Sequence, residues 1–386
     1  MKHRTSSPDR PCCAAAPAPN VPLPAGVTRR RFLYGVGAAT VGGIALPALD
    51  VAAAEGLSRR GPRPRRVLTV QPVLTYEVPQ RREATSWRSW GGLQTDADAD
   101  QERARIEREL AEMARGADFP VEIRPVQAVK AVEPAARLAK ADHDVTIIFG
   151  AGGWLDILEA LSARDKWNLM FLRHDPGPAY LWYEIVHPRF LRKTVDEYGQ
   201  PGWDVNDVVV DRYAELLWRL RALSGLKNTL GRRIVCVGGP AGWGVGGETA
   251  PARARELWKM DLVEYGYDRL GPRIGEALGN RHLASACAAA ADRYLGARGV
   301  ALETTREFVA NAFVLTEVFK DLMDEAGADA ITVNQCMGTI MGMAKTTACL
   351  PLSLLNDGGY LASASPTSWS FPRACCCTTS RTCPCS

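Results

Sequence analysis

The sequence predicts an α/β protein, and three observations lead to that class. Short β-branched runs alternate with amphipathic helical segments, which is the rhythm of parallel sheets covered by helices on both faces. Glycine-rich loops follow two of these runs, at 150–153 and 238–247. The rhythm also occurs twice, on either side of a connection at 174–204 that is rich in aromatic residues, proline and glycine. We therefore expect two Rossmann-like three-layer domains with parallel sheets, at 55–200 and 201–362.

The N-terminal segment, residues 1–54, has the pattern of an export signal. RRRFL at 29–33 precedes the weakly apolar run GVGAATVGGIALPAL and the small residues VAAA at 51–54. This order is typical of a secretory signal, and the paired arginines resemble a twin-arginine (Tat) signal. A transmembrane anchor is the alternative, but the apolar run of about 15 residues is shorter than the roughly 20 that a spanning helix needs. We expect Tat export to a periplasmic or other extracytoplasmic compartment, with cleavage near Ala54.

The first half of the body begins with a linker and a strand. GPRPRR at 61–66 is the linker, and the apolar run at 67–70 predicts a short buried strand. A helix is expected over 96–116, because acids occupy its first turn, apolar residues recur at helical spacing and a glycine ends it. The acids complement the positive end of the helix dipole.

An edge strand is expected next, at 121–126. Pro120 and Pro125 lack a backbone donor, which favours the edge of a sheet over its centre. The remaining elements expected in this half are a helix over 135–141, a strand over 145–149, a helix over 154–163 and a strand over 169–172.

The second half repeats the alternation after the long connection. The elements expected there are a strand at 207–210, a helix over 213–223, a strand at 234–237, two or three helices, a long helix over 304–326, a strand at 331–333 and an element that starts within 346–355. The pattern fails after Ala362, where residues 363–386 form a tail rich in Ser, Pro, Thr and Cys.

Charge and cysteine usage bound the partners. The net charge is only +4, and apart from runs at 29–31 and 59–66 the basic residues are spread among acids, so nucleic acid is not expected. The cysteines of the patterned body are widely spaced in apolar surroundings, which favours buried thiols over a disulfide framework. They are Cys236, Cys287, Cys336 and Cys349. The tail cysteines have no partner histidines for a soft-metal site.

The glycine-rich loop after the strand at 234–237 is the first candidate site. Glycines at such a position let a ligand approach backbone N–H groups at a helix N-terminus. Gly242, Gly244 and Gly247 match the dinucleotide pattern G-x-G-x-x-G, with Glu264 at the spacing of a ribose contact. However, Trp243 is bulky where a dinucleotide needs space. A glycine loop facing a ligand cleft is therefore the preferred interpretation, with Trp243 as a candidate for substrate binding.

Further candidate residues for substrate binding follow other strands. Trp87 and Trp90 come after the first strand, where two indoles can stack on the apolar face of a sugar. Asn334 and Cys336 follow the strand at 331–333 and offer an amide and a soft sulfur. For both pairs, ordinary loop packing is an equally open interpretation.

Arg173 and His174 follow the strand at 169–172 and are also candidates for substrate binding. The chain has five histidines, and none has the spacing of a metal ligand relative to another histidine or a carboxylate. A loop hydrogen-bonding role is the alternative for His174. We assign no metal ligand.

Three segments together resemble the L-fucose/L-arabinose isomerase-like family, in particular a bacterial group of sugar isomerases. The segments are RHDPGPAYLWYEIVHPRFLRK at 173–193, ADAITVNQCMG at 328–338 and TTACLPLSLLNDGGYLA at 346–362. The resemblance covers about 67–362. It implies two Rossmann-like domains followed by a third, β-rich domain, and homo-oligomers whose active site forms between neighbouring chains.

The resemblance also implies the chemistry of metal-dependent aldose–ketose isomerisation. A divalent metal, usually Mn²⁺, grips two oxygens of the sugar and stabilises the developing charge of the ene-diol. Carboxylates bind the metal and move the proton between carbons. The expected partner is therefore a small-molecule sugar and the expected cofactor of the family is Mn²⁺, a hard ion that prefers oxygen ligands.

The chain departs from this family after Ala362. The family continues with Cys-Glu-Ser-Asp, an apolar strand and later an acidic loop and a His, and its metal ligands are that Glu, the later acid and the His. This chain has Ser-Ala-Ser-Pro at 363–366 instead. The catalytic residues are thus expected past Ala362 and are absent from the sequence, and the β-rich third domain is missing with them.

The tail at 363–379 suggests the reason. Back-translated with one nucleotide restored before it, this segment can encode FCESDFVVIPAGVLLHH. Two of every three bases are constrained in such a match, so chance is a poor explanation. We interpret the tail as the product of a one-base deletion, and we expect the chain to bind no Mn²⁺ and to be inactive as an isomerase.

Two other functions stay open from the sequence. An exported sugar-binding protein would use two α/β domains around a cleft without catalysis. An exported NAD(P)-dependent oxidoreductase would use the glycine loop. The membrane is expected as a partner only through the export signal.

Overall fold

The computed structural model describes residues 57, 61–80, 83, 93–175, 177, 180, 190, 203–242 and 244–364. The predicted export signal lies outside these residues, as does the tail from Ser365 onward. Every strand pairing among the described residues is parallel, within two separate sheets, so the α/β class with parallel sheets is confirmed. No helix in the described part of the chain has the length and apolarity needed to cross a bilayer.

The first sheet has the strand order β2-β1-β4-β5-β6, with β3 also beside β1. Its elements and the associated helices are β1 (Leu68–Thr75), α2 (Asp96–Arg115), β2 (Val121–Ile123), β3 (Gln127–Val129), α3 (Val132–Ala139), β4 (Val145–Gly150), α4 (Leu155–Leu161), β5 (Trp167–Leu172), β6 (Val208–Val210) and α6 (Tyr213–Thr229).

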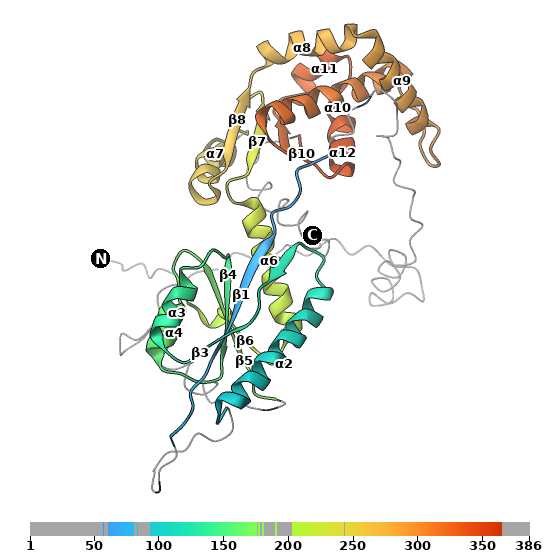
Figure 1. The fold of residues 1–386 in the computed structure, drawn as a ribbon. Helices are drawn as coiled ribbons and strands as arrows, with labels where there is room; N and C mark the ends of the chain where they lie inside the picture. The colour runs from blue at the N-terminus through green and yellow to red at the C-terminus, as the bar shows by residue number, and fades with distance from the viewer. Residues whose placement is uncertain are drawn as a thin grey trace, which may run out of the picture. The chain divides into compact units, whose positions relative to one another are not determined.

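Helices cover both faces of this sheet (Figure 1). α2 and α6 pack on one face, where Ile106 and Leu216 join the apolar side chains of β1 and β4. α3 and α4 pack on the other face through Ala135 and Leu158. The arrangement agrees with right-handed crossovers. The chain steps from β1 to β2 in one direction through α2, and it steps in the opposite direction from β3 to β4 through α3 and from β4 to β5 through α4. A fixed handedness therefore places α2 on one face of the sheet and α3 and α4 on the other.

The second sheet has the order β10-β9-β7-β8. Its elements are β7 (Arg233–Val237), α7 (Gly244–Trp258), β8 (Asp261–Tyr265), α8 (Tyr267–Gly279), α9 (Arg281–Leu295), α10 (Arg306–Ala326), β9 (Ala330–Val333), α11 (Met341–Ala344), α12 (Cys349–Asp357) and β10 (Leu361–Ser363). α8, α10, α11 and α12 share a core with one face of β7 and β9. The opposite face packs against α7 through Ala254.

The boundary expected at residue 200 is corrected for β6. The sequence interpretation assigned this strand to the second half, but it pairs with β5, with Met170 opposite Val208. The helix that follows it, α6, also packs on the first sheet through Leu216 and Leu220. The first sheet and its helices therefore extend to Thr229, and the second sheet begins at Arg233.

β1 is longer than expected because Pro72 is tolerated inside it. Val70 pairs with Ile123 of β2, and Val73 pairs with Gln127 of β3. Pro72 therefore lies opposite the break between β2 and β3, where no ladder hydrogen bond from its nitrogen is needed.

Candidate functional site

The strand order reverses at one point in each sheet. The chain leaves β1 for β2 on one side and then returns to β4 on the other; in the same way, it leaves β7 for β8 and returns to β9. In open parallel sheets, ligands bind outside the carboxyl ends of the strands at this switch point. The candidate sites are therefore the loops after β1 and β4, and the loops after β7 and β9.

At the second switch point, Asn334 connects the two loops. Its backbone N–H donates to the carbonyl of Val237, and its side-chain amide donates 2.9 Å to the carbonyl of Ala241 in the glycine loop. The hydroxyl of Tyr267, at the start of α8, donates to the backbone carbonyl of Asn334. The sequence-predicted Asn334 thus lies at this edge, but its amide donors are used to hold the glycine loop.

Cys336 is half-buried beside this cluster. It begins a π-helical turn at Cys336–Ile340, after Gln335 adopts a left-handed conformation with φ of 55°. Burial raises the pKa of Tyr267 to about 12, and the nearby Cys336 adds to the rise. Tyr267 therefore stays protonated at neutral pH and acts as a hydrogen-bond donor rather than as a base.

Gly238 has no room for a side chain at this edge. Its φ is +74°, and a Cβ would lie 2.6 Å from Cε2 of Tyr267 and 3.2 Å from the carbonyl oxygen of Asn334. We predict that Gly238→Ala displaces the Tyr267 ring and costs about 2 kcal/mol of unfolding free energy, measured by urea denaturation. Gly239→Ala is the control, since φ is +95° but no atom lies within 4 Å. Equal losses for both variants would show that backbone strain, not the Tyr267 contact, sets the cost.

The dinucleotide pattern is placed as a strand, a glycine loop, a helix and a strand. A Cβ at Gly247 would lie 2.4 Å from the backbone carbon of Gly242, so the loop packs tightly on the first turns of α7. Glu264 lies in β8, where its carboxylate is 3.5 Å from the guanidinium of Arg255 on α7. Trp243 lies outside the described residues. Nicotinamide binding stays a prediction.

Arg173 is placed in a buried ionic network, away from an open surface. Its guanidinium is 3.0 Å from a carboxylate oxygen of Glu102 and 2.7 Å from one of Glu109, both on α2. The hydroxyls of Tyr180 and Tyr213 donate to the same two carboxylates, at 2.6 and 2.8 Å. A sugar would have to displace these partners to reach Arg173.

Two opposing effects, burial and hydrogen bonding, set the pKa of the Glu109 carboxyl in this network. Burial alone would raise its pKa, but hydrogen bonds from Arg173 and Tyr213 outweigh that effect and hold the pKa below its ordinary value. Glu109 is therefore ionised at neutral pH, and the network ties α2 to the carboxyl end of β5 and the start of α6.

His174 is exposed at the carboxyl end of β5. Its backbone N–H donates 2.6 Å to the carboxylate of Asp211, which also accepts from the N–H of Asp175 at 3.1 Å. These two bonds fasten Asp211, whose φ of 58° lies in the left-handed region. Trp87 and Trp90 lie outside the described residues, so their predicted stacking role stays untested.

Sequence reasoning missed a polar cluster at the first switch point. The hydroxyl of Tyr76, just past β1, donates 2.8 Å to Asp96 at the start of α2, and Lys130, just past β3, lies 2.7 Å from the same carboxylate. The hydrogen bond from Lys130, with that from Tyr76, lowers the pKa of Asp96. Each residue is unremarkable in the sequence. The parallel pairing of β1 with β3 places Tyr76 beside Lys130, and Asp96 joins them from the first turn of α2.

The described residues do not fit a manganese site. No group of three or more His, Cys, Asp or Glu side chains in the described part of the chain is arranged to hold a metal ion. The donors at the second switch point are an amide, a phenol and a thiol, whereas a hard divalent ion needs several oxygen ligands.

No protein-family model matches the chain, and no curated protein matches it either.

Proposed function

We propose that the chain is an exported sugar isomerase-like protein whose metal-binding segment is encoded in another reading frame. The observation that carries the proposal is the shifted reading of 363–379, FCESDFVVIPAGVLLHH, directly after the family-like segment NDGGYLA at 356–362. The fold is compatible with this proposal, because the described residues form two parallel sheets of the same winding, each with a switch point. The twin-arginine segment supports export.

The proposal assigns different parts to sugar binding and to metal binding. In the family that the chain resembles, Mn²⁺ polarises two sugar oxygens and stabilises the charge that develops between them. The ligands of that ion would follow the frame break, so residues 363–386 as they stand do not supply them. We therefore expect the 386-residue chain to turn over no aldose and the frame-restored chain to do so.

The test compares two genes that differ by one nucleotide. One encodes the 386-residue chain, and the other carries one added nucleotide before the Ser363 codon. Both proteins are assayed against a panel of aldoses with and without MnCl₂, after manganese content has been measured. Activity that needs Mn²⁺ and appears only after restoration supports the proposal. The matched control is the restored protein with glutamine in place of the glutamate of Cys-Glu-Ser-Asp, which should lose both metal and activity.

Three outcomes would contradict the proposal. Turnover of any aldose by the 386-residue chain would show that the metal site lies elsewhere. A restored frame that soon meets a stop codon would remove the third domain. Sugar binding that is independent of Mn²⁺ in both proteins, without turnover, would favour the exported sugar-binding protein instead.

A further inference from the structure

A pocket of about 920 Å³ lies at the amino ends of the strands of the second sheet, opposite to the switch point. The sheet contributes residues at or just before the starts of its strands, among them Arg232, Arg233, Asp261 and Asp329. The other wall is the basic linker GPRPRR at 61–66. The volume is within the range of small-molecule sites, which is about 300–1,000 Å³.

The linker is held in place by a clamp at Arg66. The backbone N–H of Arg66 donates 2.8 Å to the side-chain oxygen of Asn228, whose amide donates back to the Arg66 carbonyl at 3.2 Å. The Arg66 guanidinium also donates to the carbonyls of Lys227 and Leu230. Pro62 and Pro64 restrict the remaining backbone. The linker is therefore anchored at Arg66, and its prolines limit the backbone conformations of the residues before it.

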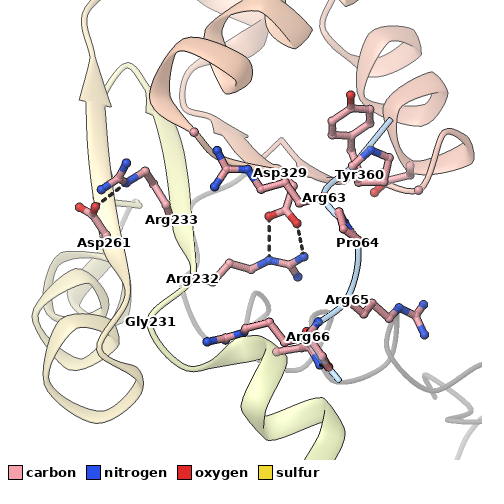
Figure 2. A pocket seen from close by; sticks show the side chains of 15 residues that line it. Arg63, Pro64, Arg65, Arg66, Gly231, Arg232, Arg233, Asp261, Asp329 and Tyr360 are labelled. Atoms are coloured by element: carbon pink, nitrogen blue, oxygen red, sulfur yellow. Dashed lines mark hydrogen bonds and ion pairs between the residues drawn. The ribbon is translucent and has the colours of Figure 1, made fainter. Parts of the chain in front are cut away.

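The side chains of the linker do not all face the same way. Figure 2 shows Arg63 and Arg66 reaching from the linker toward β7, whereas Arg65 points to the opposite side of the segment. The Arg63 guanidinium packs against Gly327, where a Cβ would come within 2.7 Å of it. Gly327 ends α10 in a left-handed conformation, with φ of +64°. All three arginines line the pocket, but the side chains of Arg63 and Arg65 point to opposite sides of the linker.

The pocket carries an excess of positive charge. Arg232 forms a bidentate pair with Asp329, at 2.9 and 2.7 Å, and Arg233 lies 2.6 Å from Asp261. Arg63, Arg65 and Arg66 of the linker also line the pocket, so five arginines and two aspartates line it, an excess of three positive charges. Of the three linker side chains, those of Arg63 and Arg66 point toward β7 (Figure 2). A phosphate monoester carries about two negative charges at pH 7 and matches guanidinium geometry.

We propose that this pocket binds a small phosphate monoester. The phosphate is held among Arg63, Arg66 and Arg232, and the remaining volume takes the organic part of the molecule. The site is separate from the proposed isomerase site, because it lies at the amino ends of the strands and uses none of the residues at the switch point. It gives a function to the basic linker, which the export signal and the sugar chemistry do not use.

The test is calorimetric titration of the full chain with glycerol 3-phosphate and with inorganic phosphate at low salt. We expect saturable binding of glycerol 3-phosphate that weakens as NaCl is raised, and none of glycerol. Arg63→Gln should weaken binding at least tenfold. Arg65→Gln is the matched control: it removes the same charge from the same linker and should change affinity less than threefold. Thermal unfolding verifies that both variants fold like the parent chain.

The possible outcomes separate the sources of the phosphate. Binding to vesicles that contain phosphatidic acid, lost in Arg63→Gln but not in Arg65→Gln, would support phosphate recognition and assign the ligand to a lipid headgroup. Equal loss in the two variants would overturn the proposal, since only general charge would then matter. Absence of binding to glycerol 3-phosphate, inorganic phosphate and the vesicles would overturn it as well.

Discussion

Arg173→Met should lower the free energy of unfolding by about 3–5 kcal/mol, the usual cost of breaking a buried ion pair by removing one partner. The side chain of Arg173 is 4% exposed and that of Glu102 is 3% exposed. Methionine fills much of the volume but leaves Glu102 as a buried carboxylate with the Tyr180 hydroxyl and the more distant Arg105 as its partners. Glu109 keeps Arg105 and Tyr213, so most of the loss is expected from Glu102.

Urea unfolding measures this loss, and hydrogen exchange of the β4 amides assigns it to the first sheet. Arg103→Met is the matched control, on the helix α2 that carries Glu102 and Glu109: its side chain is 42% exposed and pairs with Asp100 at the surface, so a change within about 0.5 kcal/mol is expected. The double variant Arg173→Met with Glu102→Gln should recover part of the stability, because it removes the unpaired charge. If the double variant recovers no stability, lost packing around Arg173 explains the effect, and the unpaired charge of the buried Glu102 does not.

The Arg173 network shows what the sequence could and could not predict about function. The sequence makes Arg173 a candidate for substrate binding because it follows a buried strand, where binding residues often lie. Its partners Glu102 and Glu109 stand seven residues apart on α2, so helical spacing places them on one face, but nothing in the sequence says that this face meets the end of β5. A polar residue after a strand is consistent with a ligand site or with a buried network, and tertiary pairing decides between them.

The fold was more predictable than the site for a physical reason. Hydrophobic period and terminal residues are local, so the sequence predicts α2 from its first acid to Gly116, and α10 close to its Thr305 cap. Sheet membership is not local. β6 looked like the start of a new half because it follows a long connection, yet it completes the first sheet beside β5. β8 was absent from the expected elements, because its segment DLVEY includes two acids and carries a weak strand signal.

His143 should make the protein less stable between pH 6.5 and pH 4. The imidazole is buried, with Nε2 2.9 Å from the hydroxyl of Thr146. Burial, followed by the positive charges of Lys166 and Arg124, lowers the pKa of His143 from 6.5 to about 4, although Asp144 opposes the shift. In this window the unfolded chain binds a proton that the folded chain does not, so stability is full above pH 6.5 and falls as the pH drops. The loss totals about 3 kcal/mol near pH 4.

The measurement is urea unfolding at intervals from pH 7 to pH 4.5, a range in which ordinary carboxyl groups in the unfolded chain titrate little until its lower end. His143→Gln keeps an amide able to reach Thr146 and removes the titration, so its stability should depend less steeply on pH than that of the parent chain. His282→Gln is the control, since this histidine is exposed on α9 and should leave the slope unchanged. If the parent and His143→Gln fall with the same slope, acid loss of stability originates elsewhere. The carboxylates paired with Arg173 and with Lys227 would then be the next groups to test, because hydrogen bonds from these cations lower the pKa of Glu109 and Asp144 against the effect of burial.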